Sequence, residues 1–126
     1  MAKILVVEDE QDSSEALARI LRLSGYDVQT VPNGKDALES IIDAPPDLVV
    51  LDLLMPGMDG VSLLKILRSY MLLKTLPVVV WTGVADAGIV ERIRTLHVNQ
   101  IIPKGQPTFN ELLRAVKDGL PPEPVN

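Results

Sequence analysis

The sequence predicts an α/β domain with an open, parallel, five-stranded sheet that is covered by helices on both faces. Five short runs of aliphatic and β-branched residues recur along the 126-residue chain, and segments with helical hydrophobic spacing separate them. The runs are continuously apolar rather than alternating, as is typical of strands buried on both faces. Strand and helix alternate five times, so right-handed crossovers give a doubly wound (βα)5 sheet.

The predicted strands are bounded by residues that favour turns or strand starts. Pro45 and Pro46 separate the second helix from the third strand, because the residue before a proline is driven out of helical conformation. Pro77 precedes the fourth strand, where a residue without an N–H is tolerated. The predicted strands are residues 4–7, 28–31, 48–51, 78–81 and 101–102.

The predicted helices carry apolar residues three or four positions apart, which gives each helix one apolar face. Gly25 follows the first helix as a C-terminal glycine, and Pro107 suits the first turn of the last helix. Asp12 is the predicted N-cap of the first helix, and Asp59 is assigned to an Asp-Gly turn. The five apolar faces comprise Leu17, Ile20 and Leu21; Leu38, Ile41 and Ile42; Leu63, Leu64 and Leu67; Ile89, Ile93 and Leu96; and Phe109, Leu112, Leu113 and Val116.

Composition narrows the class of protein. The net charge is −5, which disfavours direct nucleic-acid binding, since such sites depend on basic patches. The chain has no cysteine and one histidine, His97, so neither a disulfide framework nor a histidine-rich metal site is expected. The N-terminal apolar run is too short for a signal peptide or a membrane span. We expect a cytoplasmic domain over residues 1–119 and a proline-rich tail or linker over residues 120–126.

Chemically active side chains follow four of the five predicted strands. Glu8 and Asp9 follow the first, Asp52 the third, Thr82 the fourth and Lys104 the fifth. The carboxyl ends of parallel strands meet at one edge of such a sheet, where binding crevices form. Three carboxylates make an oxygen-rich site that suits Mg²⁺, and a hydroxyl and an ammonium can bind an oxyanion. This set of groups is arranged to transfer a phosphoryl group to a carboxylate.

These residues and the motifs around them resemble the receiver domain of two-component response regulators, over residues 2–118. The motifs are "LVVEDE", "LVVLDLLMPGMDG", "VVVWTGV" and "IIPKG". The separations between Asp52, Thr82 and Lys104 match those of the family. The resemblance implies a flavodoxin-like topology with strand order 2-1-3-4-5.

The resemblance also implies roles and partners. Asp52 is the expected phosphoacceptor for a sensor histidine kinase or a histidine phosphotransfer protein, with Mg²⁺ bound by Asp9, Asp52 and the backbone carbonyl of Leu54. Glu8 is expected to reach the metal through a water, and Thr82 and Lys104 to contact the phosphoryl group. A downstream effector is expected on the face made by the fourth helix, fifth strand and fifth helix, and a phosphorylation-dependent homodimer remains an option. Such a domain is not an enzyme, although it assists its own phosphorylation and dephosphorylation.

Four positions depart from the family pattern. Glu8 replaces the commoner aspartate, and Ile101 replaces the aromatic residue that usually lies three positions before the lysine. Gly105 follows Lys104 where the family has proline, and His97 stands where a glycine is common. These departures keep open a phosphorylation-independent pseudo-receiver scaffold.

Other interpretations compete at the level of single residues. An acidic residue after a strand is often a solvated loop residue or a cap, Asp52 could start the turn that follows it, and Lys104 could be an ordinary surface charge. A Mg²⁺-dependent phosphohydrolase is a further alternative. That class expects a second aspartate two positions after the nucleophile, where this chain has Leu54.

Overall fold

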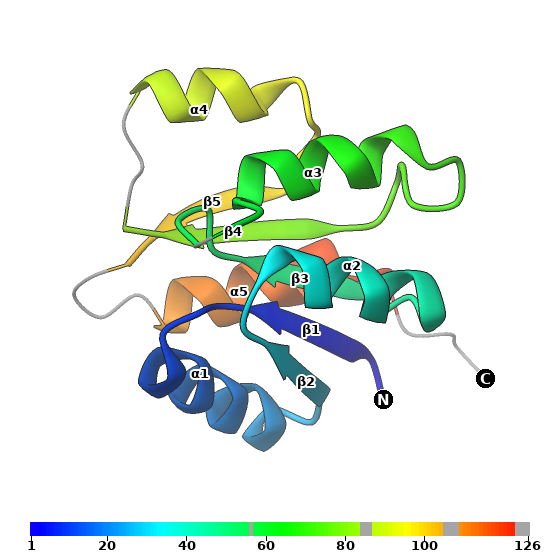
Figure 1. Ribbon diagram of the computed structural model, residues 1–126. Helices are drawn as coiled ribbons and strands as arrows, with labels where there is room; N and C mark the ends of the chain where they lie inside the picture. Colours follow the sequence, from blue (N-terminus) through cyan, green and yellow to red (C-terminus); the bar gives the residue numbers. More distant parts are fainter. Residues whose placement is uncertain (56, 84–86, 105–108, 123–126) are drawn as a thin grey trace.

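A single parallel sheet organises the part of the chain that the computed structural model describes, namely residues 1–55, 57–83, 87–104 and 109–122. Its strands lie in the order β2-β1-β3-β4-β5, as the resemblance implies (Figure 1). The strands are β1 (Lys3–Val7), β2 (Asp27–Val31), β3 (Leu48–Leu51), β4 (Val78–Thr82) and β5 (Gln100–Pro103). The predicted fold class is confirmed.

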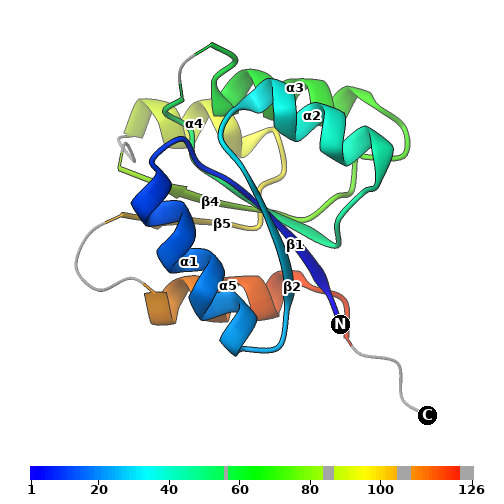
Figure 2. The same cartoon turned by 60° about the horizontal axis from the view of Figure 1, so that its bottom comes forward.

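Helices cover both faces of this sheet. Helices α1 and α5 lie on one face, and α2, α3 and α4 lie on the other (Figure 2). Each face therefore has its own buried apolar cluster, one under α1 and α5 and one under the other three helices. The helices are α1 (Gln11–Leu23), α2 (Gly34–Asp43), α3 (Gly60–Ser69), α4 (Ala87–Arg94) and α5 (Phe109–Gly119).

The prediction of continuous burial is confirmed for the central strands and wrong for the two edge strands, β2 and β5. Every residue of β3 and β4 is buried. In β2, however, Gln29 and Thr30 are exposed, because an edge strand has a neighbour on one side only. The prediction for Ile42 is also wrong: this residue is 55% exposed, and Ala37 and Ile41 lie on the buried face of α2.

The predicted roles of Asp12 and Asp59 also need correction. The side chain of Glu10, not that of Asp12, caps α1 and accepts hydrogen bonds from the backbone N–H groups of Asp12 at 3.2 Å and Ser13 at 2.8 Å. Hydrogen bonds from the Ser13 hydroxyl and, next, from the Ser13 backbone N–H lower the pKa of Glu10. Asp59 is the N-cap of α3, where it accepts from the N–H of Ser62 at 2.8 Å. Asp12 therefore lies in the first turn, where its negative charge interacts favourably with the positive end of the helix dipole.

Two positive backbone angles mark helix ends. Gly25 follows α1 with φ of 96°, which confirms its predicted place. His97 follows α4 with φ of 56°, in the left-handed region that glycine adopts more easily. His97 therefore serves as a helix-end residue, as the sequence suggests.

Arg68, near the end of α3, connects two loops through backbone carbonyl groups. Its guanidinium donates to the carbonyl oxygens of Leu73 at 3.1 Å and Leu76 at 2.8 Å, both in the segment that leads to β4. It also donates to those of Leu96 at 2.7 Å and His97 at 3.0 Å, in the segment that leads to β5. Burial lowers the pKa of Arg68. One side chain thus joins the amino-terminal ends of β4 and β5 to α3.

Gly60, the first residue of α3, allows this helix to approach the end of β3 closely. A Cβ atom at Gly60 would lie 2.7 Å from both the carbonyl oxygen of Asp52 and the Cα of Leu53. We therefore expect Gly60→Ala to lower the free energy of unfolding by about 1–3 kcal/mol through overpacking, although alanine favours helices. Urea denaturation measures this. Gly83→Ala is the control, because a Cβ there meets nothing within 4 Å, and equal losses in both variants would contradict the steric argument.

Candidate functional site

The sheet itself positions three of the predicted site residues. The backbone N–H groups of Glu8, Asp52 and Lys104 donate to carbonyl oxygens of β2, β1 and β4, at 3.1, 3.0 and 2.8 Å respectively. The parallel hydrogen-bond ladder thus continues one residue beyond β1, β3 and β5. These three residues start from the rigid frame of the sheet rather than from free loops.

Strand alternation brings the three side chains to the same side. Two positions before them stand Val6, Val50 and Ile102, which all belong to the cluster under α1 and α5. Side chains two positions apart along a strand point to the same face. The sequence could therefore place the residues at one edge, and the register adds that they converge on one side of it.

Lys104 makes direct contact with both buried carboxylates. Its Nζ lies 2.7 Å from each carboxylate oxygen of Glu8 and 3.1 Å from Oδ2 of Asp52. The side chain of Lys104 is 24% exposed, whereas those of Glu8 and Asp52 are 1% and 5% exposed. The second oxygen of Asp52, Oδ1, accepts from the N–H of Leu54 at 3.2 Å. Both oxygens of Asp52 are thus held in fixed directions.

The acidic residues fit a hard cation. Carboxylate oxygens of Glu8, Asp9 and Asp52 lie within 4.8 Å of one another, and Asp9 is exposed while the other two are buried. Oxygen donors are what Mg²⁺ prefers. The backbone N–H of Leu54 faces Asp52; its carbonyl as a metal ligand stays a prediction.

Thr82 lies at the expected strand end. It is fully buried as the last residue of β4, and its carbonyl oxygen accepts the hydrogen bond from the N–H of Lys104. The backbone therefore couples Thr82 to Lys104 directly. Contact of the Thr82 hydroxyl with a phosphoryl group stays a prediction.

The environment of Glu8 changes its protonation. Burial, together with contact with Asp52, raises the pKa of Glu8 to about 7, against the lowering effect of Lys104. Burial alone would lower the pKa of Lys104, but its contacts with Glu8 and Asp52 raise it. Glu8 thus takes up a proton more readily than an exposed glutamate, and Lys104 keeps its charge.

A pH dependence of stability follows for Glu8. The pKa rises from 4.5 to about 7 on folding, so the folded state binds this proton more tightly, and the stabilisation is complete below pH 4.5 and lost as pH rises through 7. Between about pH 5 and pH 7.5 in the absence of metal, we expect the wild type to lose roughly 1–3 kcal/mol more than Glu8→Gln. Urea denaturation at both pH values measures this. Parallel losses in the two proteins would count against it.

Removing the Lys104 ammonium should make the domain depend on a divalent cation. Lys104→Met leaves Glu8 and Asp52 buried without their cation, so we expect about 2–4 kcal/mol lower stability in a chelator. Mg²⁺ should then raise the Tm of Lys104→Met more than that of the wild type, because an ion bound at the predicted site would neutralise the same two carboxylates. Thermal denaturation with and without Mg²⁺ measures both effects. Lys65→Met is the control, because Lys65 is an exposed lysine on α3. If Mg²⁺ raises the Tm of all three proteins equally, Lys104 and Mg²⁺ do not act on the same carboxylates.

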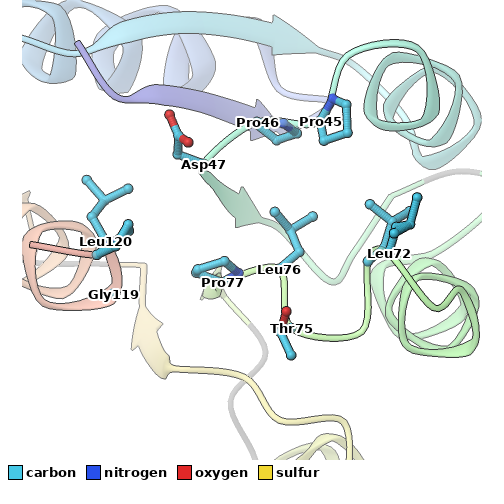
Figure 3. Close-up of a pocket in the computed structure, with 11 residues that line it drawn as sticks. Pro45, Pro46, Asp47, Leu72, Thr75, Leu76, Pro77, Gly119 and Leu120 are labelled. Atoms are coloured by element: carbon cyan, nitrogen blue, oxygen red, sulfur yellow. The ribbon is translucent and has the colours of Figure 1, made fainter.

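A groove of about 450 Å³ lies at the other end of the sheet (Figure 3). The residues that line it include Pro46 and Asp47 before β3, Leu76 and Pro77 before β4, and Leu120 after α5. These residues stand where β3 and β4 begin, whereas the acidic cluster stands where strands end. The groove is therefore separate from the candidate site.

No helix within the described ranges is long and apolar enough to cross a membrane.

Two features of the site were not foreseen from the sequence. The sequence predicts that Glu8 reaches the metal through a water, but in the structure both its carboxylate oxygens also accept from the Nζ of Lys104 at 2.7 Å. The Nζ of Lys104 also lies 4.8 Å from the ring centroid of Trp81.

Ile101 is half-buried against the cluster under α2, α3 and α4. The predictions for Gly105, for Pro107 and for residues 123–126 of the tail lie outside the described residues.

Comparison with known proteins agrees with this geometry. The response regulator receiver domain profile matches residues 4–117. The DNA-binding response regulator MtrA of Mycolicibacterium smegmatis is 37% identical over 84 residues, which are 67% of this chain and 36% of MtrA. The transcriptional regulatory protein PrrA of Mycobacterium tuberculosis is 46% identical over 67 residues, 53% of this chain and 29% of PrrA. The chain thus spans about a third of the length of these curated relatives.

Solved structures show the same fold. The response regulator TrrA from Thermotoga maritima, in complex with Mg²⁺-BeF, superposes with a TM-score of 0.85 at 29% identity, over 95% of this chain and 100% of that one. The chemotaxis protein CheY4 of Vibrio cholerae superposes with a TM-score of 0.88 at 25% identity, over 95% and 99% of the two chains.

Proposed function

The chain belongs to the receiver domain family of response regulators, and on this premise we propose that it accepts a phosphoryl group on Asp52. The observation that carries the proposal is the position of the Asp52 carboxylate. It lies at the end of β3, in contact with the ammonium of Lys104 and within 4.8 Å of oxygens of Glu8 and Asp9. A buried carboxylate among fixed charges is positioned for transfer without reorganisation.

The chemical step uses an activated phosphoryl donor. An oxygen of Asp52 forms a bond to phosphorus, while the bond from phosphorus to the leaving nitrogen of a phosphohistidine, or to the acyl oxygen of acetyl phosphate, breaks. The leaving group departs with the electron pair of that bond. Lys104 and Thr82 would contact the phosphoryl oxygens, where a positive charge and a hydroxyl donor stabilise the developing charge.

Glu8, Asp9, Asp52 and the carbonyl of Leu54 would hold Mg²⁺. A bound Mg²⁺ offsets the negative charge that the carboxylates and the phosphoryl group bring together. Lys104 contacts two of the same carboxylates in the absence of metal. Its ammonium must therefore share them with the ion when both are bound.

The donor and the output follow from the family. We infer that a histidine kinase or a histidine phosphotransfer protein supplies the phosphoryl group in the cytoplasm, and that an effector binds the face made by α4, β5 and α5. A phosphoryl group that contacts Thr82 and Lys104 better in one arrangement of the site favours that arrangement by the difference in free energy. A phosphorylation-dependent homodimer would be a further form of output.

A phosphorylation-independent scaffold is the second candidate. Ile101 favours it, because this half-buried residue packs against the apolar cluster under α2, α3 and α4 and has few rotamers. A phosphohydrolase is the weaker alternative, since Leu54 offers a 60% exposed aliphatic side chain where that class needs a general acid.

Intact mass measures the proposed function directly. After incubation with acetyl phosphate and Mg²⁺, we expect the wild-type chain to gain one phosphoryl group, which peptide mapping places on Asp52. A chelator should prevent the gain. No added mass, together with no bound species in ¹⁹F NMR with Mg²⁺ and beryllofluoride, would favour the scaffold instead.

A further inference from the structure

We propose that Trp81 is a positioning residue for the Asp52 site, and that its indole face holds the ammonium of Lys104 beside Asp52. The inference rests on the proposed function for its consequence, and on the contact between the two side chains for its geometry. The Nζ of Lys104 lies 4.8 Å from the ring centroid of Trp81. A cation within about 6 Å of an indole face is attracted by the ring quadrupole.

Trp81 lies on the side of the sheet from which Lys104 reaches the site. Trp81 and Ile102 are paired in the register of β4 and β5, and both belong to the cluster under α1 and α5. Lys104 follows Ile102 by two residues, so its side chain starts on that same side. The indole is therefore placed beneath the lysine chain by the sheet itself.

The ring also has a neighbour that limits its motion. The ring centroids of Trp81 and Phe109, the first residue of α5, lie 6.0 Å apart with an interplanar angle of 40°. Tilted aromatic pairs at this distance attract each other. Trp81 is 5% exposed, which leaves its ring little freedom. The face presented to Lys104 is thus fixed by β4 on one side and by α5 on the other.

Packing against Phe109 accounts for an aromatic ring at this position, but not for the polar N–H of an indole. The indole Nε1 is buried and has no hydrogen-bond partner among the described residues, and an unpaired buried donor destabilises the folded state. A leucine would add apolar volume to the same cluster without this penalty. What the indole adds is an electron-rich face beside a partly desolvated ammonium. Three directions then hold Lys104: Glu8, Asp52 and the ring.

The test compares Trp81→Phe, which keeps an aromatic face, with Trp81→Leu, which does not. Val79→Ala is the matched control, because Val79 is buried in the same strand and cluster and its truncation removes packing but no ring. The first readout is the ¹H chemical shift of the Lys104 ε-methylene without metal, which a ring current moves upfield. The second readout is the affinity for beryllofluoride with Mg²⁺, from ¹⁹F NMR titration.

We expect an upfield ε-methylene in the wild type and in Trp81→Phe, and a normal shift in Trp81→Leu. Beryllofluoride should bind Trp81→Leu about three- to tenfold more weakly than the wild type, and Trp81→Phe and Val79→Ala nearly as well as the wild type. The proposal is overturned if the Lys104 ε-methylene shift is the same in Trp81→Leu as in the wild type. It is also overturned if Trp81→Leu binds beryllofluoride as tightly as the wild type, or if Val79→Ala weakens that binding as much as Trp81→Leu does. If the wild type binds no beryllofluoride, the proposed function fails, and the ε-methylene shift alone decides whether Trp81 holds Lys104.

Discussion

Asp52→Asn is expected to abolish phosphoryl incorporation while the domain stays folded. Asparagine has nearly the same shape as aspartate, so its amide oxygen can still accept from the N–H of Leu54, as Oδ1 of Asp52 does at 3.2 Å. A neutral amide is a poor nucleophile toward phosphorus, however, and we expect a loss of at least about 100-fold. Intact mass after acetyl phosphate and Mg²⁺ measures incorporation, and circular dichroism measures folding.

The electrostatics of the site argue that this variant remains stable. Glu8 and Asp52 are like charges beside one ammonium. Replacing Asp52 removes one of them and leaves the shorter contacts between Lys104 and Glu8, at 2.7 Å, in place. The Tm should therefore equal or exceed that of the wild type, because repulsion between the two carboxylates disappears.

Asp59→Asn is the matched control for this experiment. Asp59 lies in the same segment between β3 and α3 as Asp52 and is the N-cap of α3. Asparagine caps helices about as well as aspartate. The control should therefore take up the phosphoryl group as the wild type does. Incorporation that survives in Asp52→Asn would mean that another carboxylate is the acceptor.

How far the sequence predicts this molecule depends on the kind of feature. The bounds of β3, residues 48–51, were predicted correctly because an uninterrupted aliphatic run ends at a charged residue. The bounds of α1 and the role of Asp59 were harder to predict. Glu10 is a weaker capping residue than Asp12 in general preference, yet the helix begins at Gln11 and places the cap on Glu10.

The site shows a similar division. The meeting of strand ends follows from parallel topology, so Asp52 and Lys104 could be placed at one edge from sequence. Their contact at 3.1 Å, and that of Lys104 with Glu8, depend on side-chain directions that are fixed only once the strand order is known. The contact of Lys104 with Trp81 has the same origin, since it needs the register of β4 against β5.

The sequence carries no signal for the role of Arg68, because its guanidinium donates to the backbone carbonyl oxygens of four residues. A side-chain pattern does not encode such partners. From sequence alone, an arginine near the end of a helix is interpreted as a surface residue whose positive charge interacts favourably with the negative end of the helix dipole. In the structure, Arg68 is half-buried and its guanidinium hydrogen-bonds to both connecting segments.

Arg68→Met is accordingly expected to produce the largest loss of stability among the variants considered. Methionine replaces much of the aliphatic chain but leaves the carbonyl oxygens of Leu73, Leu76, Leu96 and His97 without their donor. Hydrogen bonds to a charged group each contribute about 1.5–3 kcal/mol and are not additive, so we expect a total loss of roughly 3–5 kcal/mol. Urea denaturation measures the free energy of unfolding.

Two controls separate the forked geometry of Arg68 from its charge. Arg94→Met removes an arginine that is 71% exposed and pairs with Glu91 at 3.5 Å, and it should lose less than about 1 kcal/mol. Arg68→Lys keeps the charge but lacks the planar fork that reaches both segments at once, so it should resemble Arg68→Met more than the wild type. If Arg68→Lys is as stable as the wild type, charge alone suffices and the fork is unimportant.

Hydrogen exchange would locate the effect of Arg68→Met. The carbonyl groups of Leu96 and His97 precede β5, whose last residues lead to Lys104. Loss of the guanidinium should therefore speed amide exchange in the segment between α4 and β5 and in the segment between α3 and β4. The N–H of Asp52, which donates a hydrogen bond to β1, should lose protection only by as much as the global free energy of unfolding falls. If the two segments lose no more protection than Asp52 does, the variant is destabilised globally without a specific link between the two segments.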